Sequence, residues 1–398
     1  MIQRKEYLKK LIAFRDKQLI KVVTGVRRCG KSTLLKMYQE WLREQGVEAS
    51  RIISINFEDI DYEELTDYRK LYDYLKEHLN SERMTYIFLD EIQNVADFPK
   101  VVDSLYIKNN VDIYMTGSNA YMLSSEIATL ISGRYVQIEM LPFSFKEYMS
   151  AMQPGTSLET AYRRYVEKGA FPYLLQIADD SEMVREYLTG LYNTIVLKDV
   201  VARKRMTDVM MLESIVRFLA DNIGNLSVIK RVSDTLVSLG RKTSAHTVEN
   251  YISALADSYI FYPVYRYDTK GKQLLKTGQK YYLVDIGLRN IINGTKGGDL
   301  GHILENLIFL ELARRGGEIY VGKADNAEID FVVIHGERRE YYQVALSVRD
   351  EATMQRELAP LLALPDSYPK YLLTLDNDPV VYHEGIKQVY ALEWMIDK

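Results

Sequence analysis

A glycine-rich turn between an apolar run and a helix-forming stretch is the first feature of the sequence that could do chemistry. Residues 25–32, Gly-Val-Arg-Arg-Cys-Gly-Lys-Ser, fit the pattern G-x-x-x-x-G-K-[ST]. A β-branched run ends at Gly25 and good helix formers begin at Ser32, which gives the strand, loop, helix order that this pattern requires. Glycines let backbone N–H groups approach phosphates, and the amino end of the helix adds partial positive charge.

We predict that this turn binds a nucleoside triphosphate, the alternative being a surface turn that fits the pattern by chance. Lys31 would reach the β- and γ-phosphates, and the Ser32 hydroxyl would hold Mg²⁺. Cys29 is either a small packing residue or an exposed, alkylation-sensitive thiol beside a helix amino terminus. The predicted nucleotide-binding residues are Gly25, Arg27, Arg28, Cys29, Gly30, Lys31, Ser32, Thr33 and Ser118.

An acidic pair at the end of a buried strand supplies the second part of the site. The segment TYIFLDEIQ places Asp90 and Glu91 directly after an apolar run. A buried carboxylate is costly unless it meets a cation, so Asp90 is the predicted Mg²⁺ partner. Glu91 points differently and can polarise a water for attack on the γ-phosphate. A solvated strand end also permits Asp-Glu, but it does not predict a phosphate loop upstream.

Further polar residues extend the predicted catalytic group. The segment VDIYMTGSN ends in Ser118 and Asn119, and either could bind the γ-phosphate or the attacking water, while a simple loop cap is the competing interpretation. An arginine could stabilise charge on the γ-phosphate, and Arg27, Arg28 and Arg134 are the candidates. We predict Glu91, Asn119 and Arg134 as catalytic residues. No guanine-reading NKxD motif occurs, so ATP is favoured over GTP.

The elements that must position these residues are visible as alternating apolar runs and amphipathic stretches. The spacing predicts a doubly wound parallel α/β sheet covered by helices on both faces. From about residue 143 the sequence becomes helical and rich in tyrosine. The predicted strands lie at 19–25, 51–57, 85–90, 111–117 and 135–141.

Residues 206–285 predict three helices followed by a two-stranded hairpin, the arrangement of a winged helix. The helices balance their charges, whereas the hairpin loop carries Arg266, Lys270, Lys272, Lys276 and Lys280 against Asp268 alone. Such a loop could neutralise DNA phosphates. A solvated loop on a winged helix used for protein packing is the alternative. We predict DNA contact through Lys270, Lys272 and Lys276.

The carboxy-terminal residues predict a second α/β domain. Glu305 lies in a helix, Asp330 in a strand, and the next strand reads YYQVALS. A restriction-endonuclease-like fold binds Mg²⁺ and activates water with a Glu and a Lys on that strand, where this chain has Gln343 and Ala345. We therefore expect a weakened or inactive nuclease site, with Lys370 as the one substitute for the missing lysine.

Composition limits the remaining possibilities. The chain of 398 residues carries 51 Lys and Arg against 55 Asp and Glu, so DNA binding would need a local patch. One cysteine and five scattered histidines exclude an internal disulfide and a Cys-rich zinc site. No run reaches the roughly 20 apolar residues of a membrane span, and no secretion signal precedes the fold. A cytoplasmic protein is expected.

These motifs together resemble a large prokaryotic family of AAA-type P-loop ATPases, which combines the ATPase domain with a winged helix and a carboxy-terminal domain of endonuclease-like fold. The resemblance implies that Lys31, Ser32, Asp90 and Glu91 bind and hydrolyse the nucleotide. Val26 replaces the proline of the family. The segments on which this resemblance to the family rests are TGVRRCGKSTLL, YIFLDEIQNV, TGSN, SGRY…LPFSFKEY, KGAFPYLL, YYLVDIGLRN, LENLIFLEL and EIDFVV.

The expected domains are an ATPase domain (1–142), a helical subdomain (143–205), a winged helix (206–285) and an endonuclease-like domain (286–398). The favoured function is Mg²⁺-dependent ATP hydrolysis that drives a switch coupled to DNA or to a protein partner. The alternatives are an ATP-dependent nuclease and a nucleotide-stabilised interaction protein with negligible turnover. The sequence leaves oligomeric state open, and with it whether Arg134 acts on its own nucleotide or on that of a neighbour.

Overall fold

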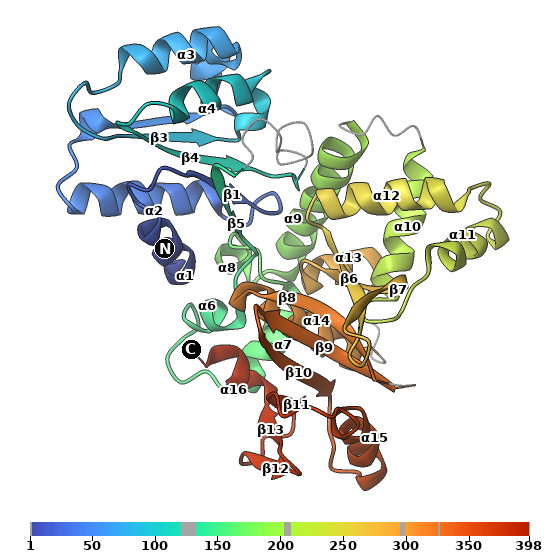
Figure 1. The fold of residues 1–398 in the computed structure, drawn as a ribbon. Helices are drawn as coiled ribbons and strands as arrows, with labels where there is room; N and C mark the ends of the chain where they lie inside the picture. The colour runs from blue at the N-terminus through green and yellow to red at the C-terminus, as the bar shows by residue number, and fades with distance from the viewer. Residues whose placement is uncertain (1, 121–132, 203–207, 295–298, 325–326, 398) are drawn as a thin grey trace. The chain divides into compact units, whose positions relative to one another are not determined.

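The computed structural model describes residues 2–120, 133–202, 208–294, 299–324 and 327–397 (Figure 1). The chain divides into two compact units. Unit 1 comprises Met1–Pro142 and Asp257–Tyr259, and unit 2 comprises Phe143–Ala256 and Ile260–Lys398. The first segment of unit 1 ends at residue 142, the position at which the ATPase domain is expected to end, and the boundary expected at 205 falls outside the described residues.

Unit 1 is a parallel five-stranded sheet of order β2-β3-β4-β1-β5, which confirms the predicted sheet and all five predicted strands. Its elements are α1 (Lys5–Ala13), β1 (Ile20–Thr24), α2 (Lys31–Glu44), η1 (Ala49–Arg51), β2 (Ile52–Asn56), η2 (Ile60–Thr66), α3 (Tyr68–Glu77), β3 (Thr85–Asp90), η3 (Ile92–Asn94), α4 (Phe98–Tyr106), β4 (Val111–Gly117) and β5 (Tyr135–Glu139).

Helices cover both faces of this sheet because successive strand residues point to opposite sides. Ile87 and Leu89 of β3 pack into a core that contains residues of α3 and α4. Phe88, which lies between them in sequence, instead contacts Tyr38 of α2, with ring centroids 6.1 Å apart. Figure 1 shows α3 and α4 on one side of the strands and α2 on the other. All the strands run the same way, so their carboxyl ends lie at one edge of the sheet.

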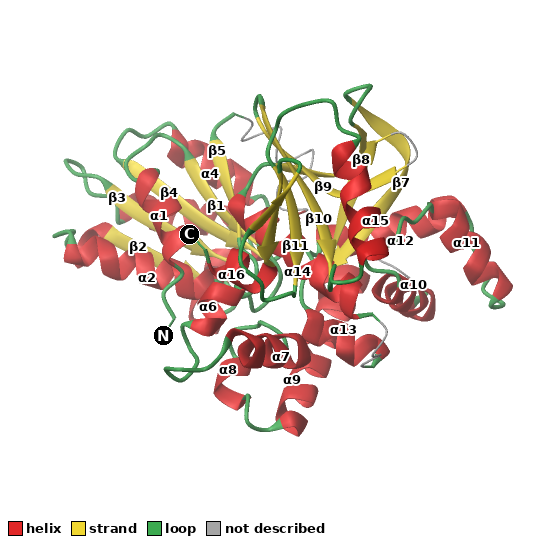
Figure 2. Ribbon diagram, turned by 90° about the horizontal axis from the view of Figure 1, so that it is seen from below, coloured by secondary structure: helices red, strands yellow, loops and turns green. Residues whose placement is uncertain are grey.

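Unit 2 combines helices with one eight-stranded sheet of order β12-β13-β11-β10-β9-β8-β6-β7 (Figure 2). Its helices are α6 (Phe145–Met149), α7 (Leu158–Lys168), α8 (Leu174–Ile177), α9 (Ser181–Thr194), the π-helix η5 (Ile195–Ala202), α10 (Val209–Asp221), α11 (Ile229–Ser238), α12 (Ala245–Asp257), α13 (Ile286–Asn293), α14 (Leu300–Arg315), α15 (Glu351–Leu362) and α16 (Ala391–Ile396). Its strands are β6 (Phe261–Asp268), β7 (Gln273–Leu283), β8 (Glu318–Ala324), β9 (Ala327–His335), β10 (Arg338–Ala345), β11 (Lys370–Thr374), β12 (Val381–His383) and β13 (Ile386–Tyr390).

The three helices and the hairpin expected for the winged helix are present as α10, α11, α12 and β6–β7. The hairpin differs from a free wing, because β6 pairs in parallel with β8 from Arg266 to Asp268. It therefore extends the large sheet. Adjacent residues of β9 point to opposite faces of that sheet, so Phe331 packs against Phe309 of α14 while Val332 joins a core with Leu361 of α15.

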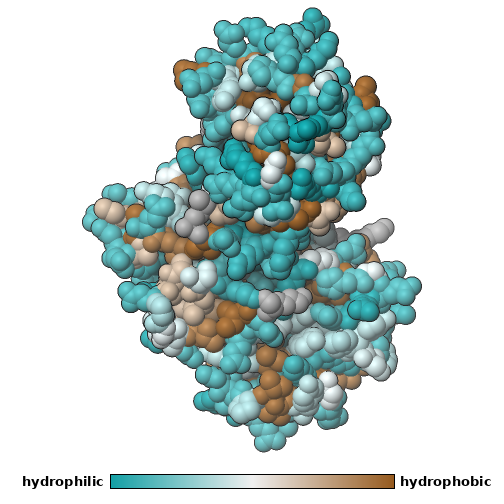
Figure 3. Space-filling view, turned by 90° about the vertical axis from the view of Figure 1, so that its left-hand side faces the viewer, coloured by the Kyte–Doolittle hydropathy of each residue, from teal (hydrophilic) through white to brown (hydrophobic). Residues whose placement is uncertain are grey.

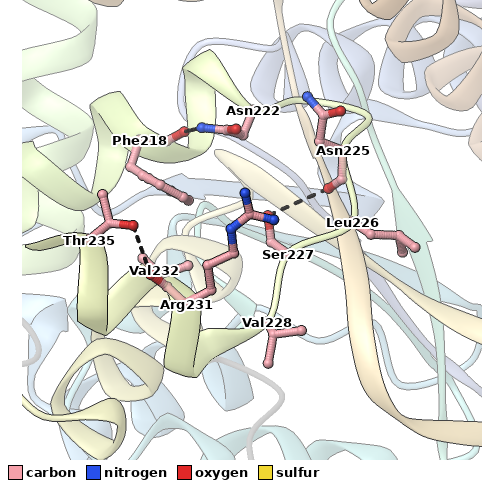
Figure 4. A pocket seen from close by; sticks show the side chains of 9 residues that line it. All are labelled: Phe218, Asn222, Asn225, Leu226, Ser227, Val228, Arg231, Val232 and Thr235. Atoms are coloured by element: carbon pink, nitrogen blue, oxygen red, sulfur yellow. Dashed lines mark hydrogen bonds between the residues drawn. The ribbon is translucent and has the colours of Figure 1, made fainter.

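A pocket of about 300 Å³ lies between α10 and α11 in unit 2, where Arg231 points toward Ser227 (Figure 4). None of the site residues predicted from the sequence lines it. On the face drawn in Figure 3, hydrophobic side chains form separate patches among polar ones. Within the described part of the chain, no helix combines the length and the apolar character needed to cross a bilayer.

Candidate nucleotide-binding site

The glycine-rich loop joins β1 to α2 at the carboxyl edge of the unit 1 sheet. Gly25 has φ +141°, and a Cβ placed on it would lie 2.1 Å from the carbonyl oxygen of Met140, so only glycine fits there. Gly30 takes the left-handed conformation immediately before α2, and no side chain caps this helix. The amide groups of its first turn are therefore arranged to bind an anion.

Lys31 is buried in the loop although it is charged. Its Nζ donates hydrogen bonds to the carbonyl oxygens of Gly25 (3.1 Å) and Val26 (3.3 Å) and lies 3.5 Å from Glu91 Oε1. Burying an ammonium group is costly unless it is bonded in this way. The lysine is thus held at the loop by weak, exchangeable partners.

Asp90 and Ser32 meet as the sequence predicts. Burial raises the pKa of Asp90, while hydrogen bonds from the hydroxyls of Ser32 and Thr116 oppose this shift. Thr116 donates to Asp90 Oδ1 and accepts from the amide of Glu91 at 2.8 Å. Oxygen ligands of this kind suit Mg²⁺, which uses one or two protein groups together with phosphates and water. The residues present therefore fit that ion.

Glu91 has an unusual backbone and a well-defined carboxylate. Its φ of 54° and ψ of 47° are left-handed, a conformation that costs a non-glycine residue about 1 kcal/mol or more and that recurs at active sites. Burial alone would raise the pKa of Glu91, but Lys31 and a hydrogen bond from Gln93 outweigh it, so the pKa lies below its usual value. The carboxylate is therefore ionised and oriented. Ser118, which directly follows β4, also lowers the pKa of Glu91.

The predicted arginines have different surroundings. Arg27 is buried and pairs with Glu58 at 2.8 Å, whereas Arg28 is exposed with φ +66°. Arg134 precedes β5 and pairs with Asp103. Because β5 runs parallel to β1 from Ile20, Arg134 lies at the amino-terminal edge of the sheet, about 16 Å along the strand from the loop. This geometry does not support action on its own nucleotide, and action on a neighbouring chain stays a prediction.

Two further results concern the loop and the end of β4. The expected alternative of an exposed, reactive Cys29 is wrong, because the thiol is fully buried and burial raises its pKa. Asn119 is buried and directly follows Ser118 after β4. Sequence reasoning missed Thr116 and Gln93. A threonine inside a fully buried strand and a glutamine two residues after the acidic pair were the available signals.

Comparisons with known proteins show which family the chain resembles. Residues 17–149 match a family described as an AAA domain. A Haemophilus influenzae protein of unknown function is 38% identical over 400 residues, covering 100% of this chain and 99% of its own. The chain belongs to the family of this protein and carries an AAA domain.

Other relatives of this AAA-type protein are more distant. A Methanocaldococcus jannaschii protein, also uncharacterised, is 31% identical over 362 residues, covering 85% of this chain and 77% of its own. A Walker-type ATPase of Pyrococcus abyssi shares the fold with a TM-score of 0.51 and 15% identity, covering 73% of this chain and 96% of that one. Residues 159–299 match a domain of unknown function.

The carboxylates of the expected nuclease site in unit 2 surround a lysine. Lys280 of β7 lies 2.8 Å from Glu305 Oε1, 2.8 Å from Glu328 Oε1 and 3.3 Å from Asp330 Oδ1. We call these four residues the Lys280 cluster. The sequence analysis placed Lys280 in the hairpin loop, among the basic residues that could neutralise DNA phosphates. This placement is wrong, because Lys280 lies within β7 and its side chain is buried. Lys370, the expected substitute, instead donates to the carbonyl oxygen of Leu364.

The remaining predicted residues of unit 2 are placed as follows. Gln343 accepts from the amide of Asp330 at 3.3 Å and donates to Glu357 at 2.9 Å, and Ala345 lies in the core beneath α15. Lys270 and Lys272 are exposed on the hairpin loop between β6 and β7. The side chain of Lys276 lies outside the described part of the structure.

Proposed function

We propose that this protein binds ATP with Mg²⁺ and hydrolyses it. The observation that carries the proposal is the meeting of Lys31, Ser32, Asp90 and Glu91 at the carboxyl edge of one sheet, beside an uncapped helix amino terminus. Phosphate groups would accept hydrogen bonds from the first turn of α2 and from the Lys31 ammonium, which at present bonds only to carbonyl oxygens and to one carboxylate.

Ser32 and Asp90 would hold the magnesium ion, which when bound neutralises charge on the phosphates. Glu91 acts as the general base that polarises the attacking water, because its lowered pKa keeps it ionised at neutral pH. Ser118 and Asn119, which follow the neighbouring strand, would orient the water or the γ-phosphate. The absence of a guanine-reading motif favours ATP as the nucleotide.

The test compares phosphate release by the wild type with that of Glu91→Gln, with and without Mg²⁺. We expect Glu91→Gln to bind ATP and to lose roughly 10²- to 10⁴-fold in kcat, since it removes a general base. Glu64→Gln is the matched control, because it makes the same chemical change at an exposed carboxylate. Equal turnover by wild type and Glu91→Gln would leave only nucleotide binding, as in an interaction protein.

We propose further that unit 2 couples nucleotide turnover to a partner, and that this partner is DNA. The support is the hairpin loop between β6 and β7, on which Lys270 and Lys272 are exposed. Replacing Lys270, Lys272 and Lys276 with Glu should weaken DNA retention and flatten its salt dependence. The control variant carries the same three changes at the exposed residues Lys5, Lys36 and Lys76. Unchanged retention would favour a protein partner.

A further inference from the structure

Arg4 is a charged residue that the fold buries at the start of α1. Its side chain is among the buried polar groups, with 2% of the residue exposed. The guanidinium donates to the carbonyl oxygens of Cys29 (3.1 Å), Leu141 (2.7 Å) and Pro142 (3.4 Å). A buried guanidinium is tolerated only when such acceptors satisfy it. One of these acceptors belongs to the glycine-rich loop and the other two follow β5.

The bond to Cys29 orients the peptide that follows it. The Cys29–Gly30 peptide is trans, since the described residues contain no cis bond, so its carbonyl and its N–H point in opposite directions. Holding the carbonyl oxygen toward Arg4 therefore aims the amide of Gly30 away from Arg4. Gly30 immediately precedes α2, where the amide groups are arranged to bind an anion.

The segment 140–142 supports the other end of the loop as well. The amide of Met140 donates to the carbonyl of Thr24 at 2.8 Å, and the Met140 carbonyl fills the space where Gly25 lacks a Cβ. The amide of Leu141 donates to the hydroxyl of Tyr7 on α1 at 3.2 Å. Both ends of the loop are thus connected to residues 140–142, the amino end directly and the carboxyl end through Arg4.

We propose that Arg4 is a positioning residue for phosphate binding, which acts through the Cys29–Gly30 peptide and ties the loop to residues 140–142. The inference rests on the proposed nucleotide binding and adds a residue that the loop motif does not contain. Arg4 donates to backbone carbonyl oxygens, so its expected effect is on the direction in which the amide of Gly30 points. A phosphate contact of this kind is made equally in the ground state and the transition state, so its loss raises KM more than it lowers kcat.

The test measures ATP turnover and the dissociation constants of ATP and ADP for Arg4→Gln and Arg4→Lys. We expect Arg4→Gln to raise KM and both dissociation constants by about tenfold, with kcat within about threefold of wild type. The reason is the loss of the charge-assisted hydrogen bond that holds the Cys29 carbonyl oxygen. The KM and dissociation constants of Arg4→Lys should lie between those of the wild type and Arg4→Gln, since an ammonium group cannot span several carbonyls as the guanidinium fork does. Lys5→Gln, one residue along and exposed, should match the wild type.

The outcomes separate this inference from the proposed function. Failure of the wild type to bind ATP, or binding that survives Lys31→Ala, would overturn both. Wild-type binding that Lys31→Ala abolishes, together with KM and dissociation constants within about twofold of wild type in Arg4→Gln, would overturn the role of Arg4 alone. A fall in kcat without a rise in KM would do the same, and if Arg4→Gln does not fold, Arg4→Lys decides by the same criteria.

Discussion

The two units each bury a lysine among carboxylates, and the two lysines are held very differently. Lys31 in unit 1 bonds to two backbone carbonyls and lies 3.5 Å from a single carboxylate. Lys280 in unit 2 lies within 3.3 Å of three carboxylates. The first ammonium can exchange its partners for phosphate at little cost. The second is the counter-ion that allows its carboxylates to be buried.

The two lysines also differ in the backbone that surrounds them. Lys31 begins a helix whose amide groups no side chain caps, and it follows a loop of glycines. Lys280 sits within a strand, and the hydroxyl of Tyr282 donates to Glu305 at 2.6 Å to complete that carboxylate's bonding. The comparison teaches that acids near a lysine do not by themselves make a catalytic centre. What matters is whether the lysine is already neutralised.

The comparison also bears on the nuclease alternative. In the Lys280 cluster the ammonium lies where Glu305 and Asp330 could otherwise share a cation, and Gln343 replaces a carboxylate on the adjoining strand. Among the described residues, no group of three or more acidic, histidine or cysteine side chains is arranged to hold a metal ion. The geometry therefore favours a structural role for the cluster.

The largest expected effect comes from removing each lysine in turn. Lys280→Met should destabilise unit 2 by about 3 to 5 kcal/mol, because it leaves buried carboxylates without a counter-ion. Lys31→Met should cost unit 1 only about 1 kcal/mol, since it removes hydrogen bonds of ordinary strength. The two tryptophans, Trp41 in α2 and Trp394 in α16, report the two units separately during denaturant unfolding of Trp→Phe single-tryptophan variants.

Lys272→Met is the control for this experiment, because it removes an exposed lysine from the same hairpin. It should leave both unfolding curves where they are. Equal losses from Lys280→Met and Lys31→Met would break the distinction between a locked and an exchangeable lysine.

A second, smaller effect is the pH dependence of unit 2. Burial, together with the Glu305 carboxylate and against the pull of Lys280, raises the pKa of Asp330 to about 7, and burial raises that of Asp285 to about 6. Both carboxyl groups therefore bind a proton more tightly in the folded chain than in the unfolded chain. Their contribution to stability is therefore complete below about pH 4 and is lost as pH rises toward 7.

We expect the Trp394 unfolding midpoint to fall between pH 5 and pH 8, and Asp330→Asn to flatten the upper part of this fall. Other titratable groups lie around Asp330, namely Glu305, Glu328 and Lys280 of the cluster and His302, which lies 3.7 Å from Glu305. The comparison is therefore made on the slope and not on absolute stability. Asp378→Asn, at an exposed position, serves as the control. The same slope in wild type and Asp330→Asn would show that Asp330 is ionised throughout.

The sequence predicted unit 1 well because its signals are local. Each parallel strand is a short apolar run, and the phosphate loop, Asp90 and Glu91 follow strands at fixed spacing. Thr116 and Gln93 escaped prediction because their roles depend on strand register and on the left-handed backbone at Glu91, which no periodicity encodes. The carbonyls that bind Arg4 lie 25 and 137 or more residues away, beyond any local pattern.

Unit 2 shows where this kind of reasoning fails. The three helices and the hairpin of residues 206–285, the helix that contains Glu305 and the strands that contain Asp330 and Gln343 were predicted from their own patterns, whereas β8, β12 and β13 were not. Glu305 and Asp330 do come together, around Lys280. The role of Lys280 was not predictable, because five basic residues on a hairpin favour a solvent-exposed wing. The pairing of β6 with β8, which are separated in sequence by β7, α13 and α14, shows that the hairpin belongs to a larger sheet, and the burial of Lys280 shows that its side chain faces inward.

The smallest effect concerns the amides that accompany the two acidic groups. Gln93 donates to Glu91, and Gln343 donates to Glu357 at 2.9 Å. If catalysis takes place only in unit 1, Gln93→Ala should lower kcat about tenfold, because the Glu91 carboxylate loses the hydrogen bond that orients it as general base. The ATP dissociation constant should be unchanged. Gln343→Ala should leave both values at wild type. A loss of turnover in Gln343→Ala, at constant Trp41 unfolding, would mean that the unit 2 acids contribute to the reaction after all, and the contrast between the units would have to be abandoned.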